Sequence, residues 1–269
     1  MITTRSFISY TIFLLISINN ISGQNSPLSD QYIKIAEDYK KDQKPDSSIV
    51  YYEKASIEFQ ALGNIEMFIS SYNQIGIILT RKDEYEKALI YLNKALSIGL
   101  SSLDSNNLEI ATTYISLGVI YNAEENYDQS LIYHYKALSI RLRVLGKMDP
   151  QTATSYGNIG NVYLNAKEYD KSIDAHLKAL KIREKVFGKT SVEIIESYRG
   201  LGNAYREKKN YKKALEYFKK ALDNKIMQRG QGHKDLVRFY NYISEVYYLM
   251  DDKLNGEKFK IKAEEINKQ

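Results

Sequence analysis

The sequence of 269 residues contains no cysteine and only three prolines. The lack of cysteine excludes disulfide bonds, thiolate metal ligands, a cysteine nucleophile and the lipid-modified cysteine of a lipoprotein. Because Pro27, Pro45 and Pro150 are the only prolines, long stretches of the chain are open to helix formation. The β-branched runs that are typical of strands do not appear either. We therefore expect an all-α protein.

A strong excess of charge of one sign is also missing. The chain has 38 Lys and Arg against 33 Asp and Glu, which gives a net charge of +5 that is spread along its length. Such a balance is weak evidence for a polyanionic partner. With 43% hydrophobic and 12% aromatic residues, the chain can bury a sizeable core, which excludes a disordered protein.

A long apolar run, Phe7–Ile18, lies near the amino terminus. It follows the positive charge of Arg5 and is shorter than the roughly 20 residues that a membrane-spanning helix needs. Small residues, Ser22 and Gly23, come after it. This order predicts a signal peptide over residues 1–23 that is cleaved after Gly23.

A cleaved signal peptide predicts an exported protein, periplasmic or secreted, in a bacterial envelope. We expect no stable membrane insertion once the signal peptide is removed. The alternative is an uncleaved anchor, because the expected cleavage site lacks the preferred small residues of an A-x-A pattern.

An internal repeat of 42 residues occupies most of the remaining chain. We call residues at the same position of successive repeats a rung. Three rungs show the repeat most clearly: Gly76, Gly118, Gly160 and Gly202; Ala95, Ala137, Ala179, Ala221 and Ala263; Tyr72, Tyr114, Tyr156, Tyr198 and Tyr240. Two further tyrosine series keep the same interval: Tyr121, Tyr163, Tyr205 and Tyr247; Tyr85, Tyr127, Tyr169 and Tyr211. A more divergent copy precedes them by 40 residues, with Tyr32, Ala36, Tyr39 and Ala55 on the same rungs.

Each repeat contains two helical patterns separated by a short polar segment. In the copy around residue 160, one face of a first helix is formed by Tyr156, Ile159, Gly160 and Tyr163. One face of a second helix is formed by Tyr169, Ser172, His176, Ala179 and Leu180. The short segment between them predicts antiparallel neighbours, and the small Gly160 and Ala179 allow close approach.

Capping residues mark the boundaries between repeats. Asp149 with Pro150 predicts the start of one first helix, and the spacing of Thr190 and Glu193 matches a capping box. Three glycines are expected to end the preceding helices: Gly146, Gly188 and Gly230.

The order of Tyr, Ile or Leu with Gly, Tyr, then Ala or Ser, an aromatic residue or His, and Ala resembles the tetratricopeptide repeat, whose usual period is about 34 residues. The longer unit of 42 residues, which ends in segments such as ALKIREKVFGK, is similar to the repeats of kinesin light chain and related bacterial proteins. The resemblance covers residues 29–269, which leaves residues 24–28 as a linker. It implies a right-handed α-solenoid of about six antiparallel helix pairs.

The two end copies depart from the repeat pattern. The first copy has Pro45 and Ser48 in its second helix, and the last has Gly256 and Lys260 where Ala and an aromatic residue are expected. We interpret these changes as polar substitutions that allow the two end repeats of the array to be exposed to solvent.

The resemblance also implies a concave groove lined by the first helices. The residues expected to line it for a partner are Asn73, Asn122, Asn161, Asn165, Arg199, Asn203, Arg206, Asn241 and Glu245, with Ile77, Thr80, Thr112, Thr154 and Tyr248 beside them. Because an amide both donates and accepts hydrogen bonds, a row of Asn residues can bind an extended peptide backbone. The alternative is that these are ordinary solvated helix residues.

Other candidate sites are better explained by the repeat. His134 and His176 share a rung with Leu92 and Phe218, so core packing is expected rather than metal binding. The segment GLGNAY is not a phosphate-binding loop, because it lies inside a helical pattern that follows no strand. In the basic stretch 206–220 the aromatic residues lie on the core stripe, so nucleic-acid binding is not expected.

The sequence therefore predicts an exported, non-enzymatic scaffold that binds a protein or peptide partner, with no cofactor and no metal. Two alternatives stay open: a ligand-sensing input module of an envelope signalling system, and an enzyme whose helical array forms a catalytic cleft. Carboxylates that converge in a deep pocket would favour the enzyme.

Overall fold

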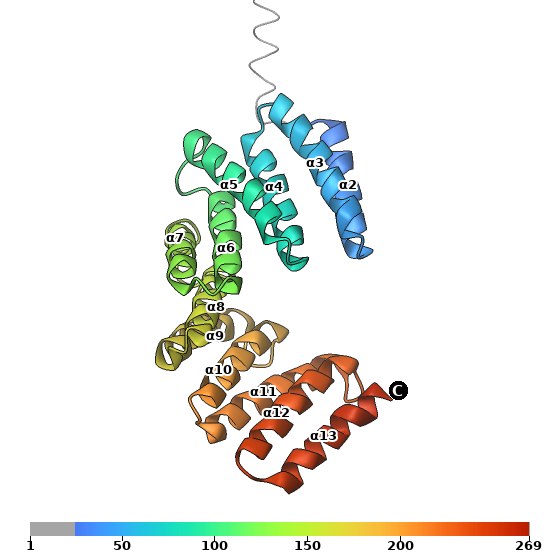
Figure 1. Ribbon diagram of the computed structural model, residues 1–269, viewed down its shortest axis with the longest axis vertical. Helices are drawn as coiled ribbons and strands as arrows, with labels where there is room; N and C mark the ends of the chain where they lie inside the picture. The colour runs from blue at the N-terminus through green and yellow to red at the C-terminus, as the bar shows by residue number, and fades with distance from the viewer. Residues whose placement is uncertain (1–24, 269) are drawn as a thin grey trace, which may run out of the picture. The chain divides into compact units, whose positions relative to one another are not determined.

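The computed structural model describes residues 25–268, and all regular structure in this range is helical. The predicted signal peptide, residues 1–23, lies outside the described residues. Within them, twelve α-helices follow one another in six consecutive pairs (Figure 1). Their bounds are α2 Pro27–Lys41, α3 Pro45–Ala61, α4 Ile65–Arg81, α5 Tyr85–Ser102, α6 Leu108–Ala123, α7 Tyr127–Val144, α8 Pro150–Asn165, α9 Tyr169–Phe187, α10 Ile195–Glu207, α11 Tyr211–Arg229, α12 Val237–Leu249 and α13 Lys253–Asn267. The prediction of an all-α chain of about six helix pairs is confirmed.

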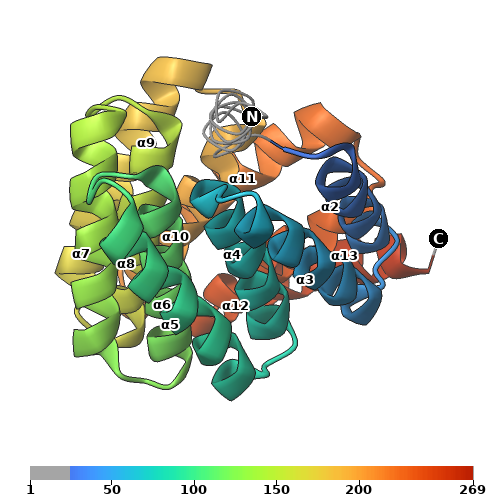
Figure 2. The ribbon, with the colours of Figure 1, turned by 90° about the horizontal axis from the view of Figure 1, so that it is seen from above.

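The chain divides into two compact units, one ending at Ile120 and one beginning at Tyr121. In the first unit, α2 packs against α3, α3 against α4, and α4 against α5 (Figures 1 and 2). In the second unit, each helix from α7 to α12 packs against the next one in the chain. A hairpin that buries its apolar stripe against the following hairpin is the building principle of an α-solenoid.

Small residues set the distance between paired helices, as expected. A Cβ atom added at Gly160 of α8 would lie 2.8 Å from the His176 ring of α9. At Gly202 of α10 it would lie 2.4 Å from the Phe218 ring of α11. Ala179 is completely buried. These two hairpins therefore have no room for a side chain on the glycine rung.

The two end copies use the same buried contact as the central ones, so the interpretation of Ser48 and Gly256 as polar ends is wrong. In the α8–α9 hairpin the Ser172 hydroxyl donates to the Gly160 carbonyl over 2.8 Å. Ser48 makes the same bond to the carbonyl of Ala36 over 2.8 Å. In the last hairpin the roles are exchanged, since Ser244 donates to the carbonyl of Gly256 over 2.7 Å. Both end residues are buried, and each is small because two helices touch there.

The turn inside every hairpin contains one non-glycine residue whose backbone adopts the left-handed conformation. These residues are Gln43, Asp83, Glu125, Lys167, Lys209 and Asp251, with φ between 58° and 62°. Two of the longer connections between hairpins instead use glycine, Gly188 at φ 83° and Gly230 at φ 82°. Both end the preceding helix, α9 and α11, as predicted.

Helix starts agree with the predicted cap at one boundary and differ from it at another. Asp149 Oδ1 accepts from Gln151 N over 2.7 Å, and α8 begins at Pro150. The capping box expected at Thr190 is wrong, because Ser191 caps a short 3₁₀ turn, η1 (Val192–Ile194), that precedes α10. A second 3₁₀ turn, η2 (Lys234–Leu236), precedes α12.

The first helix also begins earlier than the predicted linker allows. The Ser26 hydroxyl accepts from Ser29 N over 3.0 Å, which starts α2 at Pro27 instead of Ser29. Between residues 25 and 268, no helix has both the length and the apolar composition needed to cross a membrane.

Candidate functional site

The first helices of the second unit, α8, α10 and α12, form the surface on which most of the predicted partner-binding residues lie. We call this the first-helix surface. α8 and α10 contact each other directly, although they belong to successive hairpins. Their packing stripes face the second helices, which leaves the polar side of each first helix on this surface.

Ion pairs join α10 to α12 across this surface. Arg206 Nη1 of α10 lies 2.8 Å from Glu245 Oε2 of α12, so two of the predicted residues pair with each other. Glu196 of α10 binds Arg199 Nε over 2.7 Å and Arg238 Nη2 of α12 over 3.4 Å. Such partly exposed pairs contribute about 0–1 kcal/mol each. They orient the arginines without fixing them, so a carboxylate ligand could exchange with Glu196 or Glu245.

The predicted amides have different environments. Asn165 Nδ2 donates to Asn122 Oδ1 over 3.1 Å, which links α8 to the last turn of α6. Asn241 is exposed, whereas Asn161 and Asn203 are partly buried. The Oδ1 atom of Asn203 is covered and has no hydrogen-bond partner. Because an unpaired covered acceptor lowers stability, removal of the Asn203 amide is not expected to destabilise the helix array.

Asn73 does not belong to an accessible surface, and its assignment to the groove is corrected. It is completely buried in the first unit. Its Nδ2 donates to Glu109 Oε2 over 2.9 Å, and its Oδ1 accepts from Thr113 Oγ1 over 2.7 Å. Burial raises the pKa of Glu109, with the hydrogen bond from Asn73 acting in the opposite direction. Asn73 is thus a structural link between α4 and α6.

An arginine that the sequence analysis missed reaches the same surface from a second helix. Arg183 Nη1 of α9 donates to Ser197 Oγ of α10 over 2.6 Å, and Nη2 donates to Thr154 Oγ1 of α8 over 3.4 Å. Arg141 of α7 makes the equivalent bond to Ser155 Oγ of α8 over 3.1 Å. Burial lowers the pKa of both guanidinium groups. The signal was present in the sequence, because Arg141, Arg183 and Lys225 keep the 42-residue interval.

Both rung histidines are packed in the core, as predicted. His134 is 1% exposed and His176 is 2% exposed. One ring nitrogen of each, Nδ1 of His134 and Nε2 of His176, is buried without a hydrogen-bond partner. Burial lowers the pKa of each imidazole to about 4, with nearby arginines adding to the shift. Both rings are therefore neutral at pH 7.

The other sequence features also lie where the repeat places them. Gly200–Tyr205, the glycine-rich segment, is inside α10, and Phe218 of the basic stretch is completely buried. Across residues 25–268 there is no group of three or more His, Asp or Glu side chains that could hold a metal ion.

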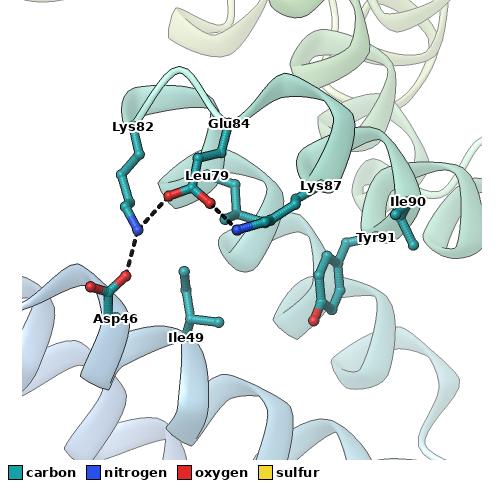
Figure 3. A pocket seen from close by; sticks show the side chains of 8 residues that line it. All are labelled: Asp46, Ile49, Leu79, Lys82, Glu84, Lys87, Ile90 and Tyr91. Carbon is teal, nitrogen blue, oxygen red and sulfur yellow. Dashed lines mark hydrogen bonds and ion pairs between the residues drawn. The ribbon is translucent and has the colours of Figure 1, made fainter.

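A cavity of about 490 Å³ lies in the first unit, between α3 and the α4–α5 turn (Figure 3). Its charged groups pair with one another: Lys82 binds both Asp46 and Glu84, and Lys87 Nζ lies 2.6 Å from Glu84 Oε2. The Tyr91 ring forms one wall. The paired charges leave this cavity with little unmet capacity to bind an ion.

Comparison with known proteins supports the repeat assignment. The tetratricopeptide repeat family matches three overlapping segments, residues 66–143, 109–166 and 151–227, which together span more than half of the chain. A search of curated proteins returned no match.

Solved structures of low sequence identity share the fold. BtubC (BKLC) of P. vanneervenii is 16% identical with a TM-score of 0.68, over 90% of this chain and 92% of that one. A putative kinesin light chain with nearly identical TPR-like repeats from Podosopora anserina is 13% identical with a TM-score of 0.61, over 74% and 96%. A tetratricopeptide repeat protein from Parabacteroides merdae is 16% identical with a TM-score of 0.57, over 87% and 78%. At these identities the likeness concerns the fold alone.

Proposed function

This chain belongs to the tetratricopeptide repeat family, and we propose from this premise that it is an exported, non-enzymatic scaffold that binds an extended peptide or protein segment on its first-helix surface. The family's fold is typical of proteins that mediate protein–protein interactions. Helix arrays of this kind present extended binding surfaces, because each repeat contributes the same positions to one face.

The observation that carries the proposal is the polar, mixed-charge character of the first-helix surface. It offers amides, from Asn161 of α8 and Asn241 of α12, and arginines, from Arg199 and Arg206 of α10. Amides can hydrogen-bond a peptide backbone in either direction. The arginines can exchange their weak bonds to Glu196 and Glu245 for carboxylates of the partner.

A non-enzymatic role is supported by the state of the carboxylates on this surface. Glu196 and Glu245 each bind arginine, and they lie on different helices. Both carboxylates are therefore engaged in ion pairs with neighbouring arginines, which is a structural use of these groups.

A comparative pull-down from bacterial envelope extract tests the binding surface. The wild-type mature chain and the double variant Asn161→Ala with Asn203→Ala are used as baits. The matched control is Asn93→Ala, which removes an exposed amide from the second helix α5. We expect a protein that is retained by the wild type and the control and is reduced in the double variant. Equal recovery by all three baits would place the binding surface elsewhere.

Export is a separate part of the proposal and has its own test. It rests on Phe7–Ile18 and the small residues after it. Amino-terminal sequencing of the protein recovered outside the cytoplasm should return a chain that begins near Gln24. Recovery of a chain beginning at Met1 from the membrane fraction would contradict cleavage and support the anchor.

A further inference from the structure

Five of the six second helices carry an aromatic ring four residues before their rung alanine, and one does not. The rings are Tyr51, Tyr91, Tyr133, Tyr217 and Phe259, whereas α9 has Ala175 at this position. We call this position of the second helix the ring position.

The rings at this position pack against tyrosines of the first helix of the same hairpin. Tyr217 stacks on Tyr205 with ring centroids 5.6 Å apart and an interplanar angle of 3°. It is also 6.0 Å from Tyr198. Phe259 repeats this arrangement, 5.6 Å from Tyr247 and 6.2 Å from Tyr240. A ring position that is occupied therefore fills the space beside two first-helix rings.

The α8–α9 hairpin keeps the two first-helix tyrosines, Tyr156 and Tyr163, and lacks the third ring. A cavity of about 430 Å³ lies there, lined by Ile159 and Ala175 as well as by both tyrosines. Its volume is within the roughly 300–1,000 Å³ of small-molecule sites. In the first unit the equivalent position is filled by the Tyr91 ring (Figure 3), which packs 5.2 Å from Tyr72.

Two lysines and a tyrosine complete the walls of the cavity. Lys171 Nζ lies 5.3 Å from the centroid of the Tyr163 ring, and Lys178 Nζ lies 5.9 Å from that of Tyr156. The Tyr135 hydroxyl of α7 is 3.0 Å from the Tyr163 hydroxyl, which brings α7 to the rim. Asp174 Oδ2 holds the Lys178 ammonium over 2.7 Å.

The position of Lys178 indicates which ring the cavity suits. In α11 the lysine at the same repeat position, Lys220, lies 5.2 Å from the centroid of Tyr217, the ring at the ring position. In α3, Lys54 lies 4.6 Å from the centroid of Tyr51 in the same way. A ring bound next to Ala175 would find Lys178 already placed for a cation–π contact, which favours electron-rich rings.

We propose that the α8–α9 cavity binds an electron-rich aromatic ring of the phenol class in the place that a tyrosine or phenylalanine occupies in the other hairpins. The site is lined by α7, α8 and α9 and is distinct from the first-helix surface. Tyr156 and Tyr163 stack against the bound ring, and Lys178 interacts with its face. Tyr135 and Asp174, at the rim of the cavity, can hydrogen-bond the hydroxyl group of the ligand. The ring could belong to a free small phenol or to a tyrosine side chain of a peptide.

Titration of the full mature chain, followed by ligand-detected NMR and calorimetry, tests the proposal with three probes. p-Cresol represents a free phenol, and N-acetyl-tyrosinamide represents a peptide-borne ring. 4-Methylcyclohexanol has a similar shape without a π system. We expect saturable binding of at least one aromatic probe, at least tenfold tighter than that of the saturated alcohol. Binding of p-cresol alone identifies a small-molecule site, and binding of N-acetyl-tyrosinamide identifies a ring within a peptide.

Two variants locate the bound ring. Ala175→Tyr restores the ring found in the other hairpins and should weaken binding of the aromatic probe at least tenfold without lowering the melting temperature. Tyr163→Leu removes one wall and should also weaken binding; leucine is tolerated there because Leu79 occupies the same repeat position in α4. The matched control, Leu177→Tyr, adds a tyrosine on the exposed part of α9 and should leave binding unchanged. Absence of saturable binding by the wild type, or unchanged affinity in a folded Ala175→Tyr or Tyr163→Leu variant, would overturn the proposal.

Discussion

At the scale of single residues, the packing around His176 is close enough to exclude any side chain beyond glycine on two neighbouring helices. Its ring lies between Gly160 of α8 and Gly200 of α10, where added Cβ atoms would be 2.8 Å and 2.4 Å from it. Gly160 was identifiable from the repeat, because it recurs every 42 residues. Gly200 was not, since it is required by a side chain of the preceding hairpin, and the sequence does not show which side chain reaches it.

Gly160→Leu is expected to lower the free energy of unfolding by about 1–3 kcal/mol, because the new side chain would force α8 away from α9. Urea denaturation followed by circular dichroism measures the change. The control on the same helix is Gly157→Ala, whose Cβ would meet only the Arg183 guanidinium at 3.9 Å. This control should be neutral or more stable by up to about 1 kcal/mol. Equal stability of Gly160→Leu and the wild type would contradict the close contact between α8 and α9 at Gly160.

The two buried histidines predict a loss of stability in mild acid. Their pKa values in the folded chain are about 4, below the ordinary value of 6.5, so protons bind preferentially to the unfolded chain. The contribution of the two neutral histidines to the free energy of unfolding should be complete above pH 6.5 and should be lost as the pH decreases from 6.5 to 4. Each histidine should account for a loss on the order of 3 kcal/mol, at about 1.4 kcal/mol per pKa unit.

The double variant His134→Leu with His176→Phe separates this effect from the titration of carboxylates. Leu92 and Phe218 occupy the same rung in other hairpins, so both replacements fit the fold. Denaturation curves at pH 7, 6, 5 and 4 should show a smaller acid-dependent loss in the variant than in the wild type. Identical pH profiles for the two proteins would mean that the histidines do not titrate as described.

At the scale of helices and turns, the sequence predicted most of what the structure shows. Periodicity alone places the helix pairs, and Gly188 and Gly230 mark helix ends, because these signals are local. The accessibility of individual side chains was less predictable. Asn73 has the sequence position of a groove residue, yet Glu109 and Thr113 of α6 cover it. Which neighbour covers a helix face depends on packing between repeats, and a repeat pattern does not specify it.

The hairpin turns provide a prediction at this scale. Lys167 adopts φ 61°, a conformation that costs a residue with a Cβ atom roughly 1–2 kcal/mol. Lys167→Gly should therefore raise the free energy of unfolding by about 0.5–1 kcal/mol, after the greater entropy of glycine in the unfolded chain is subtracted. The same replacement in the middle of α9, Lys181→Gly, should lower it by about 1 kcal/mol. Thermal and urea denaturation of the two variants should give opposite signs, and destabilisation by both would refute the strained-turn description.

At the scale of the whole molecule, the repeat accounts for the fold, and one of its irregularities, at Ala175, carries the proposed aromatic site. The family assignment could be reached from the sequence, because the rungs recur in six copies. The open cavity beside Ala175 could also have been noticed in the sequence as a missing aromatic residue. The pairing of Arg206 with Glu245, in contrast, depends on the distance between α10 and α12, which only the structure provides.

The central proposal is that a partner binds the first-helix surface through its amides. The most direct test is the affinity of the partner recovered by the pull-down, measured by calorimetry for the wild type, for Asn161→Ala with Asn203→Ala, and for the Asn93→Ala control. The double variant should bind about 1–3 kcal/mol more weakly, or about 5- to 150-fold, with helicity unchanged, because hydrogen bonds of the bound backbone are left unpaired. Affinity equal to that of the wild type would contradict the account and move the binding surface away from α8 and α10.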